Sequence, residues 1–289
     1  MITPQQEVPR LAGRLGLDKL YFKREDLHPY KSHKGRSIPV MIETHARGGH
    51  TRFAISSSGN AALAAAMYVL DYNKKFTERP LSLAIYVGQN IIPSKLKALT
   101  DLASGTIKIE KVEAPRQTVH TLEKRGEAKS LRQSQDPLAL VGYKSLADEL
   151  KQIENLGSIF IPTSSGTCAE ALGTTGVGRL AIHIVQPTSC SPIASVFDKR
   201  DENQEPILAD AIVDKVALRK DSLVEIIRKG QGGGWVVNNL EIAQAIRLAY
   251  ETERVQLNPN GALGLAGLYR AIAKGWKTKQ AVVCLITGL

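Results

Sequence analysis

The chain has 289 residues, of which 43% are hydrophobic and 23% are charged, a composition typical of a folded globular protein. Its formal net charge is +10, but the basic residues are dispersed rather than gathered in blocks with aromatic neighbours, which disfavours a nucleic-acid-binding protein. No apolar run reaches the roughly 20 residues of a membrane span, and residues 1–6 lack the pattern of a secretory signal. We therefore expect a cytoplasmic protein that does not bind a membrane.

Short β-branched or apolar runs alternate with amphipathic stretches along most of the chain. We expect strands at residues 20–22, 53–55, 81–87, 107–109, 158–162, 181–186, 234–237 and 281–286. We expect helices at residues 35–47, 61–73, 93–103, 118–130, 143–155, 239–253 and 261–274. This alternation predicts an α/β fold with mostly parallel sheets, in which functional residues commonly lie where a strand runs into a helix.

The first distinctive junction reads KREDLHPYKSHKGR over residues 23–36. Lys34 stands at the mouth of the following helix, where the positive end of the helix dipole favours loss of its proton. Lys31 and Arg36 add positive charge nearby. A lysine that loses its proton readily is a candidate for Schiff-base formation, although a solvated lysine in a basic loop would give the same pattern.

Two further junctions combine small hydroxyl side chains with a glycine. Residues 55–66, ISSSGNAALAAA, predict a seat for a carboxylate, because hydroxyls and backbone N–H groups converge at the start of a helix. Residues 159–170, IFIPTSSGTCAE, predict a seat for a phosphate by the same reasoning. They lack the lysine of a P-loop and the spacing of a dinucleotide fingerprint, which disfavours nucleotides. Either junction could also be an ordinary capped helix start.

Other catalytic arrangements find little support in the sequence. The six histidines show no HxxxH spacing with a nearby third ligand, and the three cysteines form no CxxC pair, so we expect no metal site. No GxSxG nucleophile elbow is present.

In this order, the three junctions resemble those of the tryptophan-synthase-β-like family, the fold type II enzymes that use pyridoxal 5′-phosphate (PLP). The similarity extends over nearly the whole chain, through IIPSKLKALTDLASGT, DPLALVGYKSLADEL, ILADAIVDKVALRK, LNPNGALGLAGL and VVCLITGL. The resemblance implies two α/β domains with the cofactor in the interdomain cleft, and it suggests a homodimer. We expect residues 1–43 plus 146–289 to form the large PLP-binding domain and residues 44–145 to form a smaller inserted domain.

The resemblance also implies roles for individual residues. Lys34 would form the Schiff base and serve as the general base, and Asn60 would hydrogen-bond the ring oxygen of the cofactor. The cofactor phosphate would be held by Ser164, Ser165, Gly166 and Thr167. The substrate carboxylate would be held by Ser57, Ser58 and Gly59. Thr287 would face the pyridine nitrogen, where a neutral hydroxyl makes the cofactor a weaker electron sink and favours elimination and replacement over transamination.

The chain departs from the family pattern at several positions. His33 precedes the lysine where many relatives have phenylalanine, and the phosphate loop contains one glycine, with serines in the places that glycines often fill. Asn258-Pro259 stands where Glu-Pro is usual. These departures leave the PLP prediction intact but blur the substrate.

Two reactions on a small amino acid remain open. Residues 58–62, 142–145 and 285–288 resemble threonine synthase, and the surplus of basic residues suits its phosphorylated substrate, O-phosphohomoserine. Residues 23–27 and 208–211 look more like threonine or serine ammonia-lyase. We expect the synthase reaction, with the lyase as the alternative. A non-catalytic PLP- or amino-acid-binding module is the alternative from another class, against which the intact lysine and asparagine argue.

Overall fold

The computed structural model describes residues 2–175, 180–200 and 206–288, and the chain divides into two compact units. The larger unit consists of Met1–His28 and Tyr143–Leu289, and the smaller unit of Pro29–Gly142. The domain boundaries expected from the sequence, 43/44 and 145/146, differ from these mainly at helix α2 (Lys34–Arg47). This helix packs against α3 and α6 of the smaller unit, which explains why it groups with them.

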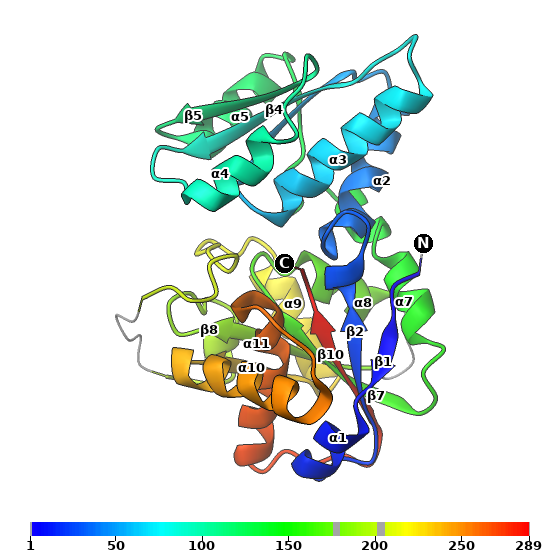
Figure 1. Ribbon diagram of the computed structural model, residues 1–289, viewed down its shortest axis with the longest axis vertical. Coiled ribbons are helices and arrows are strands. Elements are labelled where there is room, and N and C mark those ends of the chain that lie inside the picture. Colours follow the sequence, from blue (N-terminus) through cyan, green and yellow to red (C-terminus); the bar gives the residue numbers. More distant parts are fainter. Residues whose placement is uncertain (1, 176–179, 201–205, 289) are drawn as a thin grey trace. The chain divides into compact units, whose positions relative to one another are not determined.

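The sheet of the larger unit has, over the described residues, the strand order β1-β2-β10-β7-β8-β9. These strands are β1 (Gln5–Glu7), β2 (Leu20–Arg24), β7 (Leu156–Pro162), β8 (Ala181–Pro187), β9 (Gly233–Val237) and β10 (Ala281–Ile286). Figure 1 labels its strands β1, β2, β10, β7 and β8. β1 pairs with β2 antiparallel, and the other pairs are parallel. The carboxyl ends of the parallel strands β2, β10, β7, β8 and β9 therefore meet at one edge of the sheet, where such folds place their sites.

Helices flank this sheet. They are α1 (Pro9–Leu15), α7 (Lys144–Leu150), α8 (Thr167–Thr174), α9 (Lys220–Lys229), α10 (Asn239–Glu253) and α11 (Pro259–Ala273). Helix α11 is buried along most of its length and packs on β7, β8, β9 and β10. A Cβ atom at Gly267 would lie 2.3 Å from Cγ2 of Val185, so the missing side chain allows this close approach of helix to sheet.

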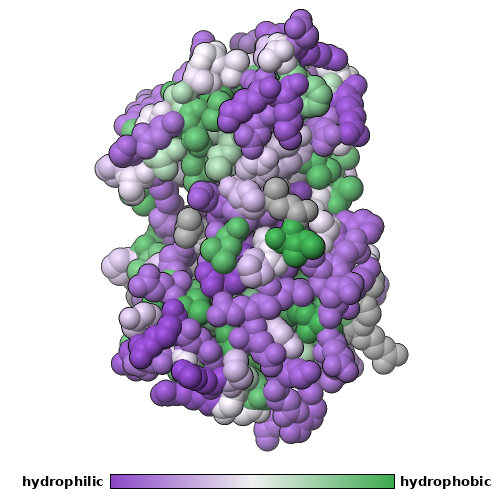
Figure 2. Space-filling view, turned by 45° about the vertical axis from the view of Figure 1, so that its right-hand side comes forward, coloured by the Kyte–Doolittle hydropathy of each residue, from purple (hydrophilic) through white to green (hydrophobic). Residues whose placement is uncertain are grey.

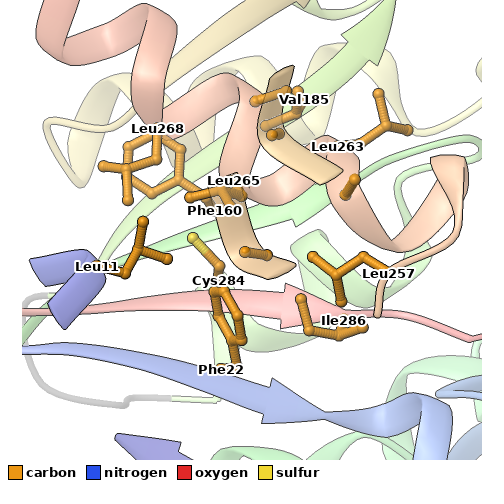
Figure 3. Packing of buried hydrophobic residues seen from close by; sticks show 14 of the residues in the cluster. Leu11, Phe22, Phe160, Val185, Leu257, Leu263, Leu265, Leu268, Cys284 and Ile286 are labelled. Atoms are coloured by element: carbon orange, nitrogen blue, oxygen red, sulfur yellow. The ribbon is translucent and has the colours of Figure 1, made fainter. Parts of the chain in front are cut away.

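The core of the larger unit fills the space between α11 and the sheet (Figure 3). Phe22, Phe160 and Cys284 come from three adjacent strands and are fully buried beside leucines of α11 such as Leu265 and Leu268. Burying each phenylalanine or leucine side chain of this interface contributes roughly 1.5–3 kcal/mol to the stability of the unit.

The smaller unit has a sheet that is parallel throughout its described pairs, in the order β5-β4-β3-β6. Its strands are β3 (Arg52–Ser56), β4 (Ser82–Gly88), β5 (Ile107–Val112) and β6 (Lys129–Ser130). Besides α2, its helices are α3 (Asn60–Lys75), α4 (Pro93–Thr100), α5 (Pro115–Lys124) and α6 (Leu138–Val141). The small side chains of buried Ala62, Ala64, Ala65 and Ala66 line the inner face of α3.

One predicted helix of the smaller unit is wrong at both ends. The sequence placed a helix at residues 118–130, whereas α5 spans Pro115–Lys124. Gly126 adopts φ +68°, a left-handed conformation that ends the helix, and Lys129–Ser130 then pairs with Phe53–Ala54 of β3. The amphipathic pattern beyond residue 124 therefore belonged to a turn and a short strand.

Figure 2 shows a face that is mostly hydrophilic, with hydrophobic residues scattered over it. Within residues 2–175, 180–200 and 206–288, no helix combines the length and the hydrophobicity needed to cross a membrane. The same described residues contain no group of three or more His, Cys, Asp or Glu side chains arranged to hold a metal ion.

Candidate active site

Lys34 is the first residue of α2, one position earlier than the sequence predicted. The backbone N–H of Lys34 donates to Oγ of Ser32 at 3.3 Å, and the N–H of Gly35 donates to the Ser32 carbonyl at 3.0 Å. Ser32 is fully buried and Lys34 is half-buried. The structure thus places Lys34 at the positive end of a 14-residue helix, as the Schiff-base hypothesis requires.

Two tyrosines of the smaller unit lie near this helix start: Tyr30 precedes it in the sequence, and Tyr68 packs against Tyr30. Tyr30 precedes Lys34 by four residues, and its hydroxyl donates to Oδ2 of Asp71 at 3.3 Å. Burial and the charge of Asp71 raise the pKa of Tyr30 to about 12. Burial and the charge of Glu43 raise the pKa of Tyr68, which packs edge-on to Tyr30, to about 12 as well. Both phenols stay protonated at neutral pH, so neither competes with Lys34 as a general base.

The predicted carboxylate seat lies between β3 and α3. β3 ends at Ser56, and α3 begins at Asn60, so Ser57, Ser58 and Gly59 form the connecting turn. The N–H of Gly59 donates to Oγ of Ser57 at 3.3 Å, and all four residues from 57 to 60 are half-buried. At the start of α3 the N–H groups of Ala62 and Leu63 donate to the carbonyl of Gly59, and those of Asn60 and Ala61 are the ones that could bind an anion. No atom lies within 4 Å of a Cβ built on Gly59, so space adjoins the turn.

The predicted phosphate seat lies between β7 and α8. Ser164, Ser165 and Gly166 form the turn, and α8 begins at Thr167. Gly166 adopts φ +87°, a conformation that favours glycine, and a Cβ there would lie only 3.0 Å from Cδ2 of Leu223. The hydroxyls of Ser165 and Thr167 are 3.0 Å apart. A left-handed glycine at a helix start turns successive N–H groups toward one concave point, an arrangement that fits a phosphate.

Thr287 follows the last residue of β10 and is buried. Nδ2 of Asn258 donates to the carbonyl of Gly288 at 2.7 Å, and Oδ1 of Asn258 accepts from the N–H of Gly261 at 2.8 Å. The asparagine that replaces the family's usual glutamate therefore caps α11 and also holds the backbone next to Thr287. Because β10 and β7 are adjacent, Thr287 and the phosphate seat lie at the same edge of one sheet.

The predicted site residues thus fall into two sets, one in each unit. Lys34, Asn60 and residues 57–59 belong to the smaller unit, whereas residues 164–167 and Thr287 belong to the larger one. Each set lies at helix starts or strand ends, as predicted. That both sets bind the same cofactor stays a prediction.

The residues that support the predicted phosphate seat were not predicted from the sequence. Oε2 of Glu170, in the first turns of α8, accepts from Nη1 of Arg219 at 2.6 Å, and Oε1 accepts from the hydroxyl of Ser222 at 2.7 Å. Gln186, the sixth residue of β8, hydrogen-bonds the residue that precedes Ser164. A polar residue within a mostly apolar strand, which also contains His183, was the signal that could have marked Gln186. No local pattern marks Arg219, because its partner is 49 residues away.

Comparison with known proteins finds a consistent set of relatives. A family model described as pyridoxal-phosphate dependent enzyme matches residues 2–288. The biosynthetic L-threonine dehydratase of Haemophilus influenzae is 23% identical over 297 residues, which cover 99% of this chain and 56% of the dehydratase. The threonine synthase of Methanosarcina acetivorans is 25% identical over 312 residues, covering 99% of this chain and 74% of the synthase. The chain therefore spans little more than half the length of the dehydratase.

Solved structures share the fold. Maize serine racemase aligns with a TM-score of 0.80 at 19% sequence identity, covering 99% of this chain and 87% of the racemase. The processed threonine deaminase isoform 2 of Solanum lycopersicum aligns with a TM-score of 0.79 at 21% identity, covering 99% of this chain and 83% of the deaminase.

Proposed function

Because this chain belongs to the pyridoxal-phosphate dependent enzyme family, we propose that it catalyses elimination or replacement at the side chain of a small amino acid. The family match and the fold confirm three predictions made from the sequence. These are membership of the family, the use of PLP as cofactor, and the two mostly parallel α/β sheets of a fold type II enzyme. The relatives include dehydratases, synthases and racemases at 25% identity or less, so they leave the reaction and the substrate to be proposed.

The observation that carries the proposal is Lys34 as the first residue of α2. When bound, PLP supplies an electron sink for bond cleavage at the substrate's α-carbon. We propose that Nζ of Lys34 would hold the cofactor covalently and would also take and return protons as the general base. The helix start favours the neutral amine that both roles need.

The remaining predicted residues would bind and orient. Ser164, Ser165, Gly166 and Thr167 would hold the phosphate at the start of α8, where the glycine conformation fits it. Asn60 would hold the ring oxygen, and the turn at residues 57–59 would hold the substrate carboxylate. The hydroxyl of Thr287, which carries no charge, would face the ring nitrogen and so favour elimination or replacement over transamination.

Charge distribution supports a phosphorylated substrate. The smaller unit, residues 29–142, contains 17 Lys and Arg against 9 Asp and Glu, a surplus of eight positive charges. The larger unit contains 21 against 19, a surplus of only two. The unit that carries Lys34 and the carboxylate seat is therefore the strongly basic one, and it would attract an anionic substrate. We propose conversion of O-phosphohomoserine to threonine as the reaction.

Threonine or serine ammonia-lyase activity is the second candidate. Solved structures with the same fold include an L-serine ammonia-lyase of Rhizomucor miehei at 17% identity and the tomato threonine deaminase at 21% identity. A non-catalytic PLP- or amino-acid-binding module is the third, and the retained Lys34 and Asn60 argue against it. By analogy with the family we further propose a homodimer in the cytoplasm, and analytical ultracentrifugation tests the dimer.

The visible absorption spectrum of the purified protein with PLP tests the proposal, with O-phosphohomoserine, L-threonine or L-serine then added separately. A band that shifts with O-phosphohomoserine, together with release of phosphate and threonine, supports the synthase. A shift with threonine or serine and release of ammonia and a 2-oxoacid supports the lyase instead. A band that no amino acid perturbs favours the binding module. Absence of any band in the wild-type protein overturns the PLP assignment to this site.

A further inference from the structure

Gln186 has a fully buried side-chain amide that hydrogen-bonds two separate stretches of backbone in the larger unit. Its Nε2 donates to the carbonyl of Thr163 at 3.1 Å. Its Oε1 accepts from the N–H groups of Ile193 and Ala194 at 2.9 and 2.8 Å. One side chain thus ties the end of β7 to the segment that leads into the 3-10 turn η2 (Ala194–Val196).

Both of these stretches adjoin Gly166. Thr163 directly precedes the turn Ser164–Gly166, and its own N–H donates to the carbonyl of Val185 at 2.9 Å. On the other side, Cδ1 of Ile193 lies 3.7 Å from the position of a Cβ on Gly166, next to Leu223 at 3.0 Å. Gln186 therefore fixes the backbone of Thr163, which leads into the turn of the predicted phosphate seat, and of Ile193, whose side chain packs beside Gly166.

We propose that Gln186 is a positioning residue for the cofactor phosphate: its amide fixes Thr163 and Ile193 on the two sides of Gly166 and so presets the turn. The inference rests on the proposed function, because the phosphate seat is its object. Gln186 acts through the backbone and does not touch the cofactor.

The role needs an amide in particular. The side chain must donate to one carbonyl and accept from two N–H groups at once, which glutamine does in a single protonation state. An ionised carboxylate accepts but cannot donate, so it would face the Thr163 carbonyl without a hydrogen bond. A protonated carboxyl group, in contrast, both donates and accepts. Burial raises the pKa of a carboxyl group, so an introduced glutamate would change protonation state in an accessible pH range.

The experiment measures the affinity of the cofactor-depleted protein for PLP between pH 6 and pH 8.5, for wild type, Gln186→Glu and Gln186→Met. Gln186→Met removes all three hydrogen bonds of the amide, and we expect it to bind PLP about 10-fold more weakly at every pH. We expect Gln186→Glu to be at least as weak near pH 8 and to approach wild type as the pH falls. Gln152→Glu adds the same charge at an exposed position and should match wild type.

A second readout follows the phosphate itself, through the ³¹P chemical shift of the bound cofactor in the holoprotein. It should move in Gln186→Met and in Ile193→Val, which removes the Cδ1 atom beside Gly166, and stay in place in Gln152→Glu. Ile193→Val keeps the test available if the Gln186 variants fail to fold, because it leaves every hydrogen bond of Gln186 intact.

Ser165→Ala combined with Thr167→Val separates the two hypotheses. If this double variant binds PLP as wild type does, the phosphate seat is misassigned and the proposed site fails. If it binds weakly while Gln186→Met keeps wild-type affinity and ³¹P shift, the seat stands and the inference about Gln186 is overturned. A Gln186→Glu defect that does not depend on pH would also overturn it, because a merely disrupted core would behave in that way.

Discussion

Replacement of His183 by glutamine should reduce the acid sensitivity of the larger unit. His183 is 1% exposed and lies in an aromatic cluster, with its ring stacked on Phe160 at a centroid distance of 4.4 Å. Nε1 of Trp235 donates to Nδ1 of His183 at 3.2 Å, and Trp276 packs edge-on at 5.2 Å. Burial without a counter-charge lowers the pKa of His183 from 6.5 to about 4.

The magnitude follows from the difference between folded and unfolded chains. As the pH falls below 6.5, the unfolded chain binds a proton that the folded chain refuses until about pH 4, so stability falls with falling pH in that range. The whole difference corresponds to about 3 kcal/mol. Between pH 7 and pH 5 the loss amounts to about 2 kcal/mol. Glutamine does not titrate, and its oxygen can still accept from the indole N–H, so His183→Gln should lack this component.

Urea unfolding at pH 7 and pH 5 measures the effect on the PLP-saturated protein. Far-UV circular dichroism is the signal, because both tryptophans of the chain contact His183 and their fluorescence would change with the substitution. The quantity of interest is the loss of unfolding free energy between the two pH values, wild type minus variant. Other titrating groups change the unfolding free energy of wild type and variant equally, so their contributions cancel in this difference. His120→Gln is the matched control, since His120 is exposed.

We expect wild type to lose about 2 kcal/mol more unfolding free energy between pH 7 and pH 5 than His183→Gln does. If wild type and His183→Gln lose the same free energy between pH 7 and pH 5, then His183 does not resist protonation and the interpretation of the cluster is refuted. If the variant is less stable by the same amount at both pH values, that loss reflects the lost ring packing. It does not support the interpretation that His183 resists protonation.

Three other variants test the site and the core. Lys34→Ala should lose the visible absorbance and the turnover but keep the wild-type far-UV spectrum, and retained absorbance would contradict the assignment. Gly267→Ala should lower the free energy of unfolding by about 1–3 kcal/mol, because the new Cβ would lie 2.3 Å from Cγ2 of Val185; an unchanged urea midpoint would mean that α11 sits farther out. Burial raises the pKa of Asp198, but hydrogen bonds from cations such as Arg270 lower it by more, to about 2. Asp198→Asn should therefore destabilise by about 3 kcal/mol at pH 7, and a wild-type thermal midpoint would show that the ion pair contributes nothing net.

The sequence predicted elements best where local signals agree with tertiary packing. Helix α10 was predicted residue for residue, because Asn238 and Glu241 form a capping box at its start and the helix ends at Arg254 in a left-handed conformation. Strand β10 was also predicted to the residue, since an unbroken apolar run is typical of a buried parallel strand. Helix α9 (Lys220–Lys229) was not predicted, although its apolar positions recur at helical spacing.

The candidate site was predictable only as far as its chemistry is local. The second and third junctions each join a strand, a short polar turn and a helix within a dozen residues, so the starts of α3 and α8 could be located from the sequence. The first junction is longer, and its lysine and basic neighbours located the start of α2. The hydrogen bond that supports the turn was not predictable, because Gln186 and Thr163 are 23 residues apart in the sequence. Their pairing exists only once β7 and β8 lie side by side.

The place of β10 in its sheet has a consequence for how the chain folds. β10 is the latest strand in the sequence, yet it lies between β2 and β7. Until Ala281–Ile286 have been synthesised, no strand connects β2 to β7. The sheet of the larger unit is then divided into two parts, β1-β2 and β7-β8-β9, each with an unpaired strand edge where β10 will later pair. The smaller unit is one continuous segment, residues 29–142, and can fold as soon as it emerges. Synthesis should therefore pass through a stage in which the basic, lysine-bearing unit is folded while the larger sheet still exposes apolar strands that a chaperone would have to cover.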